Sequence, residues 1–409
     1  MASISLFNNT AVGLSITNRR MEVVSIMRSG DSYKLQTKNS INFGKGLIER
    51  GTITDHEMVK KHITSLLQDA KPTPITNDSL FFGLSEGQVF THLFYLPQNT
   101  PISEKTINRE ARHTIPIPTR DLSVTYKKLA QFEDKQEYLI TGVNSQILNA
   151  WDSLFADLDL KTQIHSSTLA LYRGLFQQAN SQPVCIVNFD ITTTGVHIFS
   201  DHGLHYSYVI NSGGETIAQT LSEQFEIPIK KAEKMIHDEG VSHKKSKTFL
   251  TIANSLEQTF ASIRDTLNFY EKTYTESVSK ILLTGYTSNM KGLNTYAERF
   301  LELPVEIGFA KNLNEATALS FIEPLGLAHI GLFPDKGIQS EPLHVSHIQE
   351  SEDTATSKRK TYRPVSDTNN KTSGPNKTLL LLLAAALLFT VIAVAYRWYQ
   401  NSNQAMLFS

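Results

Sequence analysis

An acidic residue followed by hydroxyl side chains marks the first candidate site. Residues 188–203 read NFDITTTGVHIFSDHG, a strand that ends at Asp190, a run of threonines and a second strand that turns back at a polar corner. An acid in this position can contact Mg²⁺ on a bound nucleotide, and the hydroxyls of Thr192, Thr193 and Thr194 can donate hydrogen bonds to phosphate. An ordinary strand rich in β-branched residues explains the same letters. Both alternatives stay open from the residues alone.

The elements around this stretch predict a two-lobed α/β body. Residues 11–43 alternate apolar and polar residues, which indicates a hairpin or meander, and a helix capped by Asp55 follows. The same order returns at residues 183–225, where three strands precede a helix. A long helix then carries apolar residues on one face, at alternating spacings of four and three: Leu256, Phe260, Ile263, Leu267, Tyr270 and Tyr274. A meander followed by a helix, given twice, predicts two related lobes that face a cleft.

Composition supports a folded body and excludes several functions. With 409 residues and 40% hydrophobics, the chain can bury a core large enough for two lobes. The formal net charge of −1 gives no attraction to nucleic acid, so no nucleic-acid partner is expected. The one cysteine, Cys185, lies in an apolar run and is expected to be a buried hydrophobe. The 13 histidines are dispersed and form no recognisable metal motif.

The C-terminal part predicts a membrane anchor. Residues 379–396 contain about eighteen uncharged, mostly apolar residues, roughly 27 Å of helix, which matches a hydrocarbon core. We therefore expect a single transmembrane helix over residues 378–396 and a short extracytoplasmic tail over 397–409. Basic residues gather before the span, which places the large N-terminal part in the cytoplasm. Residues 334–376 are polar and poor in large apolar residues, and they are expected to form a disordered linker.

Several stretches together resemble the actin-like ATPase superfamily, and within it the type IV pilus assembly protein PilM. The matching stretches are residues 12–27, 46–55, 109–126, 184–199, 210–225, 281–308 and 324–333. The resemblance implies an actin-like, ribonuclease H-like fold with two related lobes formed by residues 1–79 and 161–333. It also implies a small inserted α/β subdomain at residues 80–160 and a nucleotide site in the cleft.

The first phosphate loop departs from the family pattern. Where the family has an Asp, then a Gly and further on a Lys, this chain has Ser15, Thr17 and Glu22. Arg19 and Arg20 could attract phosphate, or they could form a solvated hairpin tip. A magnesium-holding acid and a glycine that permits close approach of the backbone are therefore both absent from this loop.

The other loops keep part of the pattern. Asp190 stands where the family has its acid and is the one candidate metal contact, but Thr192 replaces the glycine. The pair Gly213 and Gly214 matches and opens a helix, a place for phosphate or for close packing between lobes. Gly285 matches in the adenine-side loop. Tyr286 replaces a second glycine, and its ring could stack on a base or fill the pocket.

These departures predict a scaffold that kept an ATPase shape. ATP with Mg²⁺ is the candidate ligand, and hydrolysis is expected to be lost before binding, because positioning and charge stabilisation supply most of the rate of phosphoryl transfer. The resemblance implies a membrane-tethered adaptor of a type IV pilus or related secretion machine at the bacterial inner membrane. Its partner would be an inner-membrane pilus assembly protein with a short cytoplasmic tail, and a homo-oligomer is compatible with the sequence.

Two alternatives remain. An actin-like cell-division protein would also tie filaments to the membrane through a tethered C-terminal segment, although such anchors are usually amphipathic helices and this one is apolar all round. An active ATPase or kinase of the same superfamily would need acids in both loops, and Ser15 argues against it.

Overall fold

Two five-stranded sheets with the same topology form the two lobes. The computed structural model describes residues 9–176, 180–243, 246–310 and 320–346. In lobe 1 the strand order is β3 (Ser32–Asn42), β2 (Arg20–Ser29), β1 (Thr10–Ile16), β6 (Ser79–Leu84) and β10 (Lys161–Ser166). In lobe 2 it is β13 (Leu204–Ile210), β12 (Thr194–Phe199), β11 (Val184–Phe189), β14 (Lys280–Thr284) and β15 (Val305–Ile307). Each sheet has an antiparallel meander followed by two parallel strands, which confirms the doubling predicted from the sequence.

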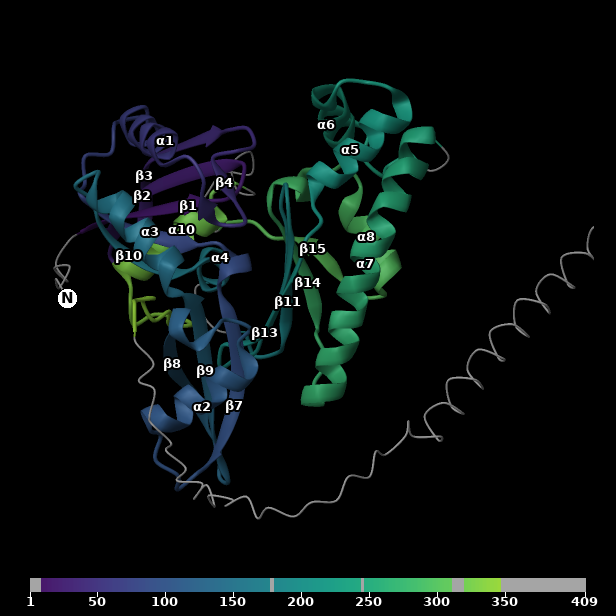
Figure 1. Cartoon of the computed structure of the whole chain (residues 1–409). Coiled ribbons are helices and arrows are strands. Elements are labelled where there is room, and N and C mark those ends of the chain that lie inside the picture. The colour runs from purple at the N-terminus through teal and green to yellow at the C-terminus, as the bar shows by residue number, and fades with distance from the viewer. Residues whose placement is uncertain (1–8, 177–179, 244–245, 311–319, 347–409) are drawn as a thin grey trace, which may run out of the picture. The chain divides into compact units, whose positions relative to one another are not determined.

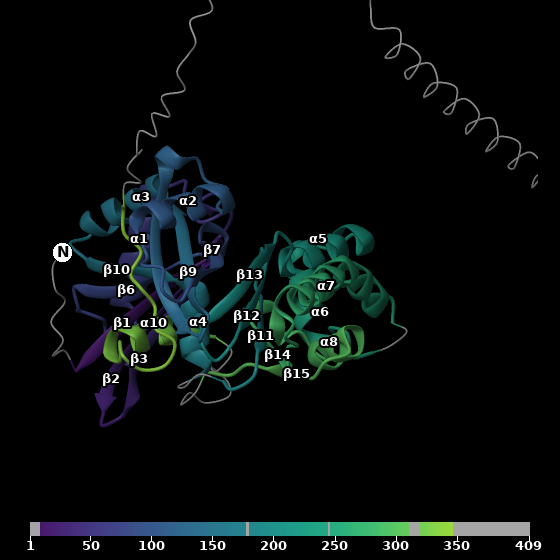
Figure 2. The same ribbon diagram turned by 90° about the horizontal axis from the view of Figure 1, so that it is seen from below.

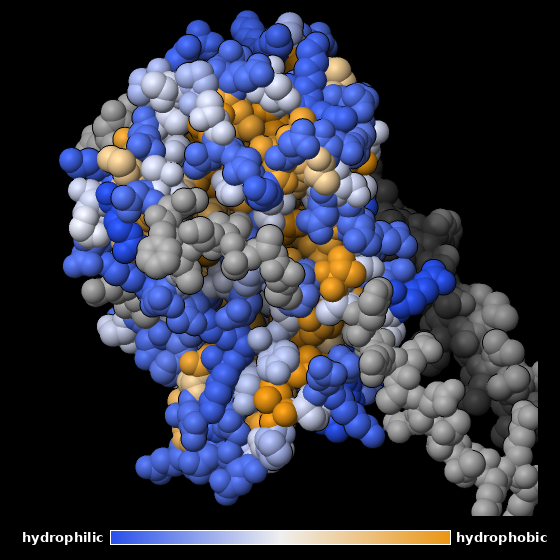
Figure 3. Space-filling model, turned by 90° about the vertical axis from the view of Figure 1, so that its left-hand side faces the viewer, coloured by the Kyte–Doolittle hydropathy of each residue, from blue (hydrophilic) through white to orange (hydrophobic). Residues whose placement is uncertain are grey.

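Helices cover the sheets and follow the predicted apolar faces (Figure 1). Lobe 1 contains α1 (His56–Gln68), α3 (Ser145–Ala156), α4 (Ser167–Leu175) and α10 (Ile322–Leu332). Lobe 2 contains α5 (Gly214–Phe225), α6 (Ile229–Asp238), α7 (Lys247–Tyr274) and α8 (Leu293–Leu301). The Asp55 side chain caps α1 by accepting from the N–H of Met58, and the predicted face of α7 is buried from Leu256 to Tyr270. On the side shown in Figure 3, apolar residues lie between broad hydrophilic areas.

Helices α4 and α10 lie between the two sheets and join the lobes. Tyr172 of α4 contacts Phe199 of lobe 2 with ring centroids 4.5 Å apart, and both rings belong to one buried cluster. The two helices approach closely because each has a glycine where it contacts the other helix. A Cβ atom at Gly326 of α10 would overlap the carbonyl oxygen of Ala170, and one at Gly174 of α4 would overlap that of Ile322. This close packing fixes the position of α10, so its first turn lies at the cleft.

The inserted subdomain is smaller than the predicted range of 80–160. It is a three-stranded antiparallel sheet of order β7 (Phe90–Pro97), β9 (Lys135–Asn144) and β8 (Leu122–Gln131), with α2 (Glu104–Thr114) against it. Residues 79–84 instead form a central strand of lobe 1. Helix α3 packs Trp151 and Phe155 into the core of lobe 1. Helix α3 belongs to lobe 1 because its apolar face packs there. The order of elements along the chain does not reveal this packing.

The segment after α10 differs from the expected linker in its first part. Residues 334–346 run along lobe 1 and the subdomain (Figure 2), and Leu343 is buried there. The remainder of the expected linker, from residue 347, lies outside the described residues, as do the expected span at 378–396 and the tail. Within the described ranges, no helix has both the length and the apolar character needed to cross a bilayer. Short elements complete the body: β4 (Ile48–Glu49), β5 (Thr52–Ile53), η1 (Glu86–Gln88), η2 (Thr119–Asp121) and η3 (Tyr286–Asn289).

Candidate functional site

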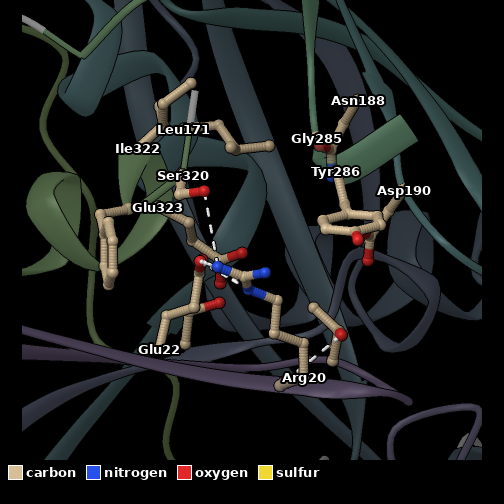
Figure 4. A pocket seen from close by; sticks show the side chains of 13 residues that line it. Arg20, Glu22, Leu171, Asn188, Asp190, Gly285, Tyr286, Ser320, Ile322 and Glu323 are labelled. Carbon is tan, nitrogen blue, oxygen red and sulfur yellow. Dashed lines mark hydrogen bonds and ion pairs between the residues drawn. The ribbon is translucent and has the colours of Figure 1, made fainter. Parts of the chain in front are cut away.

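A pocket lies between the lobes, where the first strands of the two sheets end (Figure 4). Its walls come from β1, β2 and the start of α10 in lobe 1, and from the loops after β11 and β14 in lobe 2. The lining residues are Ser15, Thr17, Arg20, Glu22, Leu171, Asn188, Asp190, Gly285, Tyr286, Ser320, Phe321, Ile322 and Glu323. Three of the sequence-predicted site residues, Asp190, Gly285 and Tyr286, are therefore in this pocket.

Asp190 is a buried acid with an unfavourable electrostatic environment. Its side chain is 9% exposed, and burial raises the pKa of the carboxyl to about 6. A hydrogen bond from the backbone N–H of Ile191 opposes this shift, whereas the carboxylates of Glu86 and Glu22 increase it. A carboxyl with this pKa is mostly ionised at neutral pH, so the pocket contains a buried negative charge. The nearby acids Glu86 and Glu22 destabilise that charge.

A second acid of the pocket, Glu323, comes from the first turn of α10. Burial raises the pKa of Glu323 well above its usual value. A hydrogen bond from the Ser15 hydroxyl opposes the shift, while Glu86, Glu22 and Asp190 add to it. The hydroxyl at the position where the family has an acid thus serves as a donor to another acid of this chain. The raised pKa favours the protonated form of Glu323, so the buried negative charge that would oppose a polyphosphate in this pocket is that of Asp190.

Arg20, which lines the pocket, is already paired. Its Nη2 atom lies 2.6 Å from Glu22 Oε1, and its guanidinium also lies 5.5 Å from the centroid of the Tyr286 ring. On the lobe 2 side the edge of His237 approaches the same ring, with centroids 5.0 Å apart. Tyr286 is thereby held between an arginine of lobe 1 and a histidine of α6, and its ring fills space in the pocket beside the loop after β14. Figure 4 shows Arg20 pointing toward Glu22 and Ser320.

The two hairpin tips that would face phosphate contact each other. Asn18 Nδ2 in the β1–β2 turn donates to Thr192 Oγ1 in the β11–β12 turn at 3.1 Å. The Asn18 side-chain oxygen in turn accepts from the N–H of Gly51, which fixes the side chain in this orientation. Beside this bond, Glu215 of α5 pairs with Lys45 at 2.8 Å and with Arg19 at 3.5 Å. We call these contacts, formed by Asn18, Arg19, Lys45, Thr192 and Glu215, the interlobe latch.

The glycine pair serves close packing in this structure. The N–H of Gly214 donates to the carbonyl oxygen of Asp190, and the N–H of Glu215 donates to that of Ile191. A Cβ atom at Gly213 would overlap the backbone of the same loop, and one at Gly214 would overlap the hydroxyl of Thr287. The first amides of α5 are therefore used inside the protein, although a free helix N-terminus is a favourable place for phosphate.

The remaining predicted residues lie away from the pocket. Thr193 uses its carbonyl oxygen to accept from the N–H of Asp190 and close the turn. Thr194 is fully buried in β12, and its hydroxyl donates to the carbonyl oxygen of Ser212 at 2.7 Å. Neither residue lines the pocket, in agreement with the alternative of a strand rich in β-branched residues for this part of the run.

Two acids near the cleft are not indicated by the sequence pattern. Glu86 follows β6 directly and accepts from His197 Nε2 of lobe 2 at 2.7 Å, with both side chains buried. Glu323 is far from Asp190 in the sequence, and it reaches the pocket because α10 packs against lobe 1. No local pattern signals either residue. Only the crossing of distant segments brings them near Asp190.

Several candidate donors for a nucleotide are engaged within the protein. Among the described residues, no group of three or more His, Cys, Asp or Glu side chains is placed to hold a metal ion. The donors that a phosphate would need are used elsewhere: the first amides of α5 within lobe 2 and Arg20 by Glu22. Thr192 is bonded to the opposite hairpin tip.

The paired sheets, the helices between them and the cleft pocket define an actin-like fold. A solved structure, the PilM-PilN type IV pilus biogenesis complex, is similar to this chain with a TM-score of 0.69 and 17% identity, and the match covers 79% of this chain and 99% of that one. The family described as Type IV pilus assembly protein PilM matches residues 13–315. The chain belongs to this family.

Two curated relatives are cell division proteins FtsA, each 23% identical. The match to the protein from Buchnera aphidicola subsp. Baizongia pistaciae extends over 296 residues and covers 65% of this chain and 64% of the relative. The match to the protein from Neisseria meningitidis serogroup B extends over 227 residues and covers 48% of this chain and 54% of the relative. The chain thus spans less than two thirds of the length of each.

Proposed function

We propose that this protein is an adaptor of a type IV pilus or related secretion machine, and that it functions by binding a partner protein at the inner membrane. Membership of the PilM family supports the pilus assignment. The similar solved structure is a complex with PilN, so the proposed partner is a PilN-type inner-membrane protein that offers a short cytoplasmic tail.

We also propose that the cleft binds nucleotide weakly and does not hydrolyse it, and the interlobe latch is the observation that carries the claim of weak binding. A phosphate group entering between the hairpin tips must break the Asn18–Thr192 hydrogen bond and separate Glu215 from Lys45 and Arg19. One hydrogen bond contributes about 1 kcal/mol and each exposed ion pair about 0–1 kcal/mol. Opening the latch therefore weakens binding by roughly tenfold to a hundredfold before any phosphate contact forms.

Loss of hydrolysis has a separate cause. Ser15 replaces one magnesium-holding acid, and the surviving Asp190 carries a raised pKa of about 6 in an acid-rich pocket. Because Ser15 has no carboxylate, the first loop cannot help to position the metal or the attacking water, and we expect the electrostatic stabilisation of phosphoryl transfer to be weakened. In place of nucleotide chemistry, we propose that the contacts across the cleft hold the two lobes together.

We further propose that the chain anchors itself in the bilayer through residues 378–396, with the body in the cytoplasm and residues 397–409 beyond the membrane. The apolar length of this stretch and the basic residues before it support the assignment. Tethering would raise the effective concentration of the body near a membrane partner. A periplasmic activity reporter fused after Ser409 should be active, and activity of a cytoplasmic reporter there would contradict this topology.

The proposal is tested by two titrations of the full-length chain in detergent. Calorimetry with ATP and Mg²⁺ should show no saturable binding in the micromolar range. A fluorescent peptide with the cytoplasmic tail sequence of a PilN-type protein encoded beside this gene should bind saturably by anisotropy, and a scrambled peptide should not. Micromolar ATP binding would refute the proposal for the cleft, and equal binding of tail and scrambled peptides would refute the adaptor role.

A second candidate is a cell-division protein that ties actin-like filaments to the membrane, and the two FtsA relatives favour it. Filaments of the purified chain on lipid vesicles, seen by electron microscopy in the presence of ATP, would support this candidate over the pilus adaptor.

A further inference from the structure

Residues 334–346 form an ordered segment that we call the strap, drawn in yellow-green after α10 in Figure 1. Its first part is fixed by Arg173 of α4, which is 3% exposed. The guanidinium donates to the carbonyl oxygens of Phe333 at 2.6 Å and Ile338 at 3.2 Å, and to that of Lys336. A single buried side chain of lobe 1 thus holds the end of α10 and the beginning of the strap together.

The second part of the strap contacts an edge strand of lobe 1. The N–H of Leu343 donates to the carbonyl oxygen of Ile164 in β10 at 2.7 Å, and the Leu343 side chain enters the core of lobe 1. Next to this bridge, Ser340 Oγ lies 3.1 Å from His165 Nδ1. Strand β10 is the last strand of its sheet, so the strap covers backbone groups that no other described strand pairs.

The other side of the strap contacts the inserted subdomain. Lys127 of β8 approaches Gln339 at 2.5 Å and Glu341 at 3.4 Å. Ser346 Oγ accepts from the N–H of Val124 at 2.8 Å and donates to the Val124 carbonyl oxygen at 3.0 Å. Because β8 is also an edge strand, the strap joins the edges of two separate sheets, one from lobe 1 and one from the subdomain.

A small pocket lies beneath the strap. Its lining comes from the subdomain, both lobes and the strap: Thr125, Tyr126, Lys127, Leu129, Leu139, Thr141, Ser166, Leu169, Leu204, Ile338, Gln339, Glu341 and Leu343. Two buried polar atoms nearby, Ser166 Oγ and His165 Nε2, have no hydrogen-bond partner among the described residues. Unpaired buried polar groups weaken docking of the strap.

From this geometry we propose that the strap is a releasable brace, which holds the inserted subdomain against lobe 1 when docked and frees it when detached. The contacts follow one another along the segment, so a force applied to the chain after Ser346 would break them one at a time. The Ser346–Val124 hydrogen bonds would break first, and the hydrogen bonds that Arg173 donates would break last. Release would uncover the edges of β8 and β10 and leave both lobe sheets intact. This inference does not depend on the proposed function of the cleft.

Hydrogen exchange of the full-length chain in detergent, read by mass spectrometry, tests the release. The hydrogen-bonded amides of Leu343, Ser346 and Val124 should exchange together, and faster than the amides of β11 by about a hundredfold or more, because a sub-global opening has a lower free energy than global unfolding. If these amides exchange as slowly as those of β11, the strap opens only with the whole protein and the proposal is wrong.

A reversible crosslink isolates the strap within one protein. Lys127 Nζ lies 3.4 Å from Glu341 Oε1, so the two cysteines of K127C with E341C lie within reach of a bismaleimide that contains a cleavable disulfide, and the native Cys185 is too buried to react. Crosslinking should slow exchange of the Leu343, Ser346 and Val124 amides by about tenfold or more, and cleavage by dithiothreitol should reverse it. Failure of the two cysteines to crosslink would contradict the docked position, and equal exchange before and after cleavage would contradict release.

A pair of substitutions provides an independent comparison. Leu343→Ser removes the buried anchor and should accelerate strap and Val124 exchange, whereas His344→Ser at the exposed neighbour should not. If Leu343→Ser does not fold, the crosslinked pair still decides the question.

Discussion

Replacing Asp190 by Asn should stabilise the protein at neutral pH. The folded-state pKa of about 6 lies about 2 units above the usual value of 3.8. Since one unit corresponds to about 1.4 kcal/mol, the ionised carboxyl destabilises the fold by up to about 3 kcal/mol. An asparagine keeps an oxygen for the N–H of Ile191 but also brings an NH₂ group, which offsets about 1 kcal/mol. We expect a net gain of about 1–2 kcal/mol at pH 7.5.

The sign of the pH dependence follows from the raised pKa. Between pH 3.8 and about 6 the folded protein binds more protons at Asp190 than the unfolded chain does. The contribution of this group is therefore most favourable below pH 3.8 and is lost as the pH rises through 6. The advantage of Asp190→Asn should thus be near its maximum above pH 7 and should disappear toward pH 4.

Urea denaturation followed by circular dichroism, at pH 4.5 and pH 7.5, measures this difference. Asp201→Asn is the matched control because the Asp201 side chain is half exposed, and its midpoint should not move. A destabilised Asp190→Asn at pH 7.5, or a difference that is the same at both pH values, would refute the electrostatic argument. Such a result would indicate that the ionised acid has a favourable partner in the cleft.

Three further substitutions test the latch and the packing, and a fourth serves as a control. Glu215→Gln should lower the free energy of unfolding by about 0.5–1.5 kcal/mol at low salt, and the difference from wild type should shrink in 0.5 M NaCl, because its ion pairs are partly exposed. Gly326→Ala should destabilise by about 2 kcal/mol or more in a urea titration, since its Cβ overlaps the Ala170 carbonyl; a neutral effect would mean that α4 and α10 can separate freely. Phe260→Ala should cost about 3–5 kcal/mol and Leu250→Ala at an exposed position less than about 0.5 kcal/mol, and similar values would disprove the assigned helix face.

Local patterns in the sequence by themselves determine many of the helices and strands of this protein. The spacing of Leu256, Phe260 and Ile263 shows which face of α7 is buried, because a helix returns to the same side every three or four residues. Asp55 marks the start of α1 because its side chain can satisfy a free N–H of the first turn. The repeated order of meander and helix also follows from the sequence, since it depends only on the succession of residues along the chain.

Tertiary structure alone decided what the cleft contains and where the C-terminal segment goes. Asn18 and Thr192 are 174 positions apart, and their hydrogen bond exists only because two lobes bring two hairpin tips together. Glu323 becomes a pocket acid because α10 returns to lobe 1, and residues 334–346 become a strap because two sheet edges lie within reach. Side-chain periodicity reports which face of an element is apolar, whereas contacts between distant segments depend on how those faces assemble.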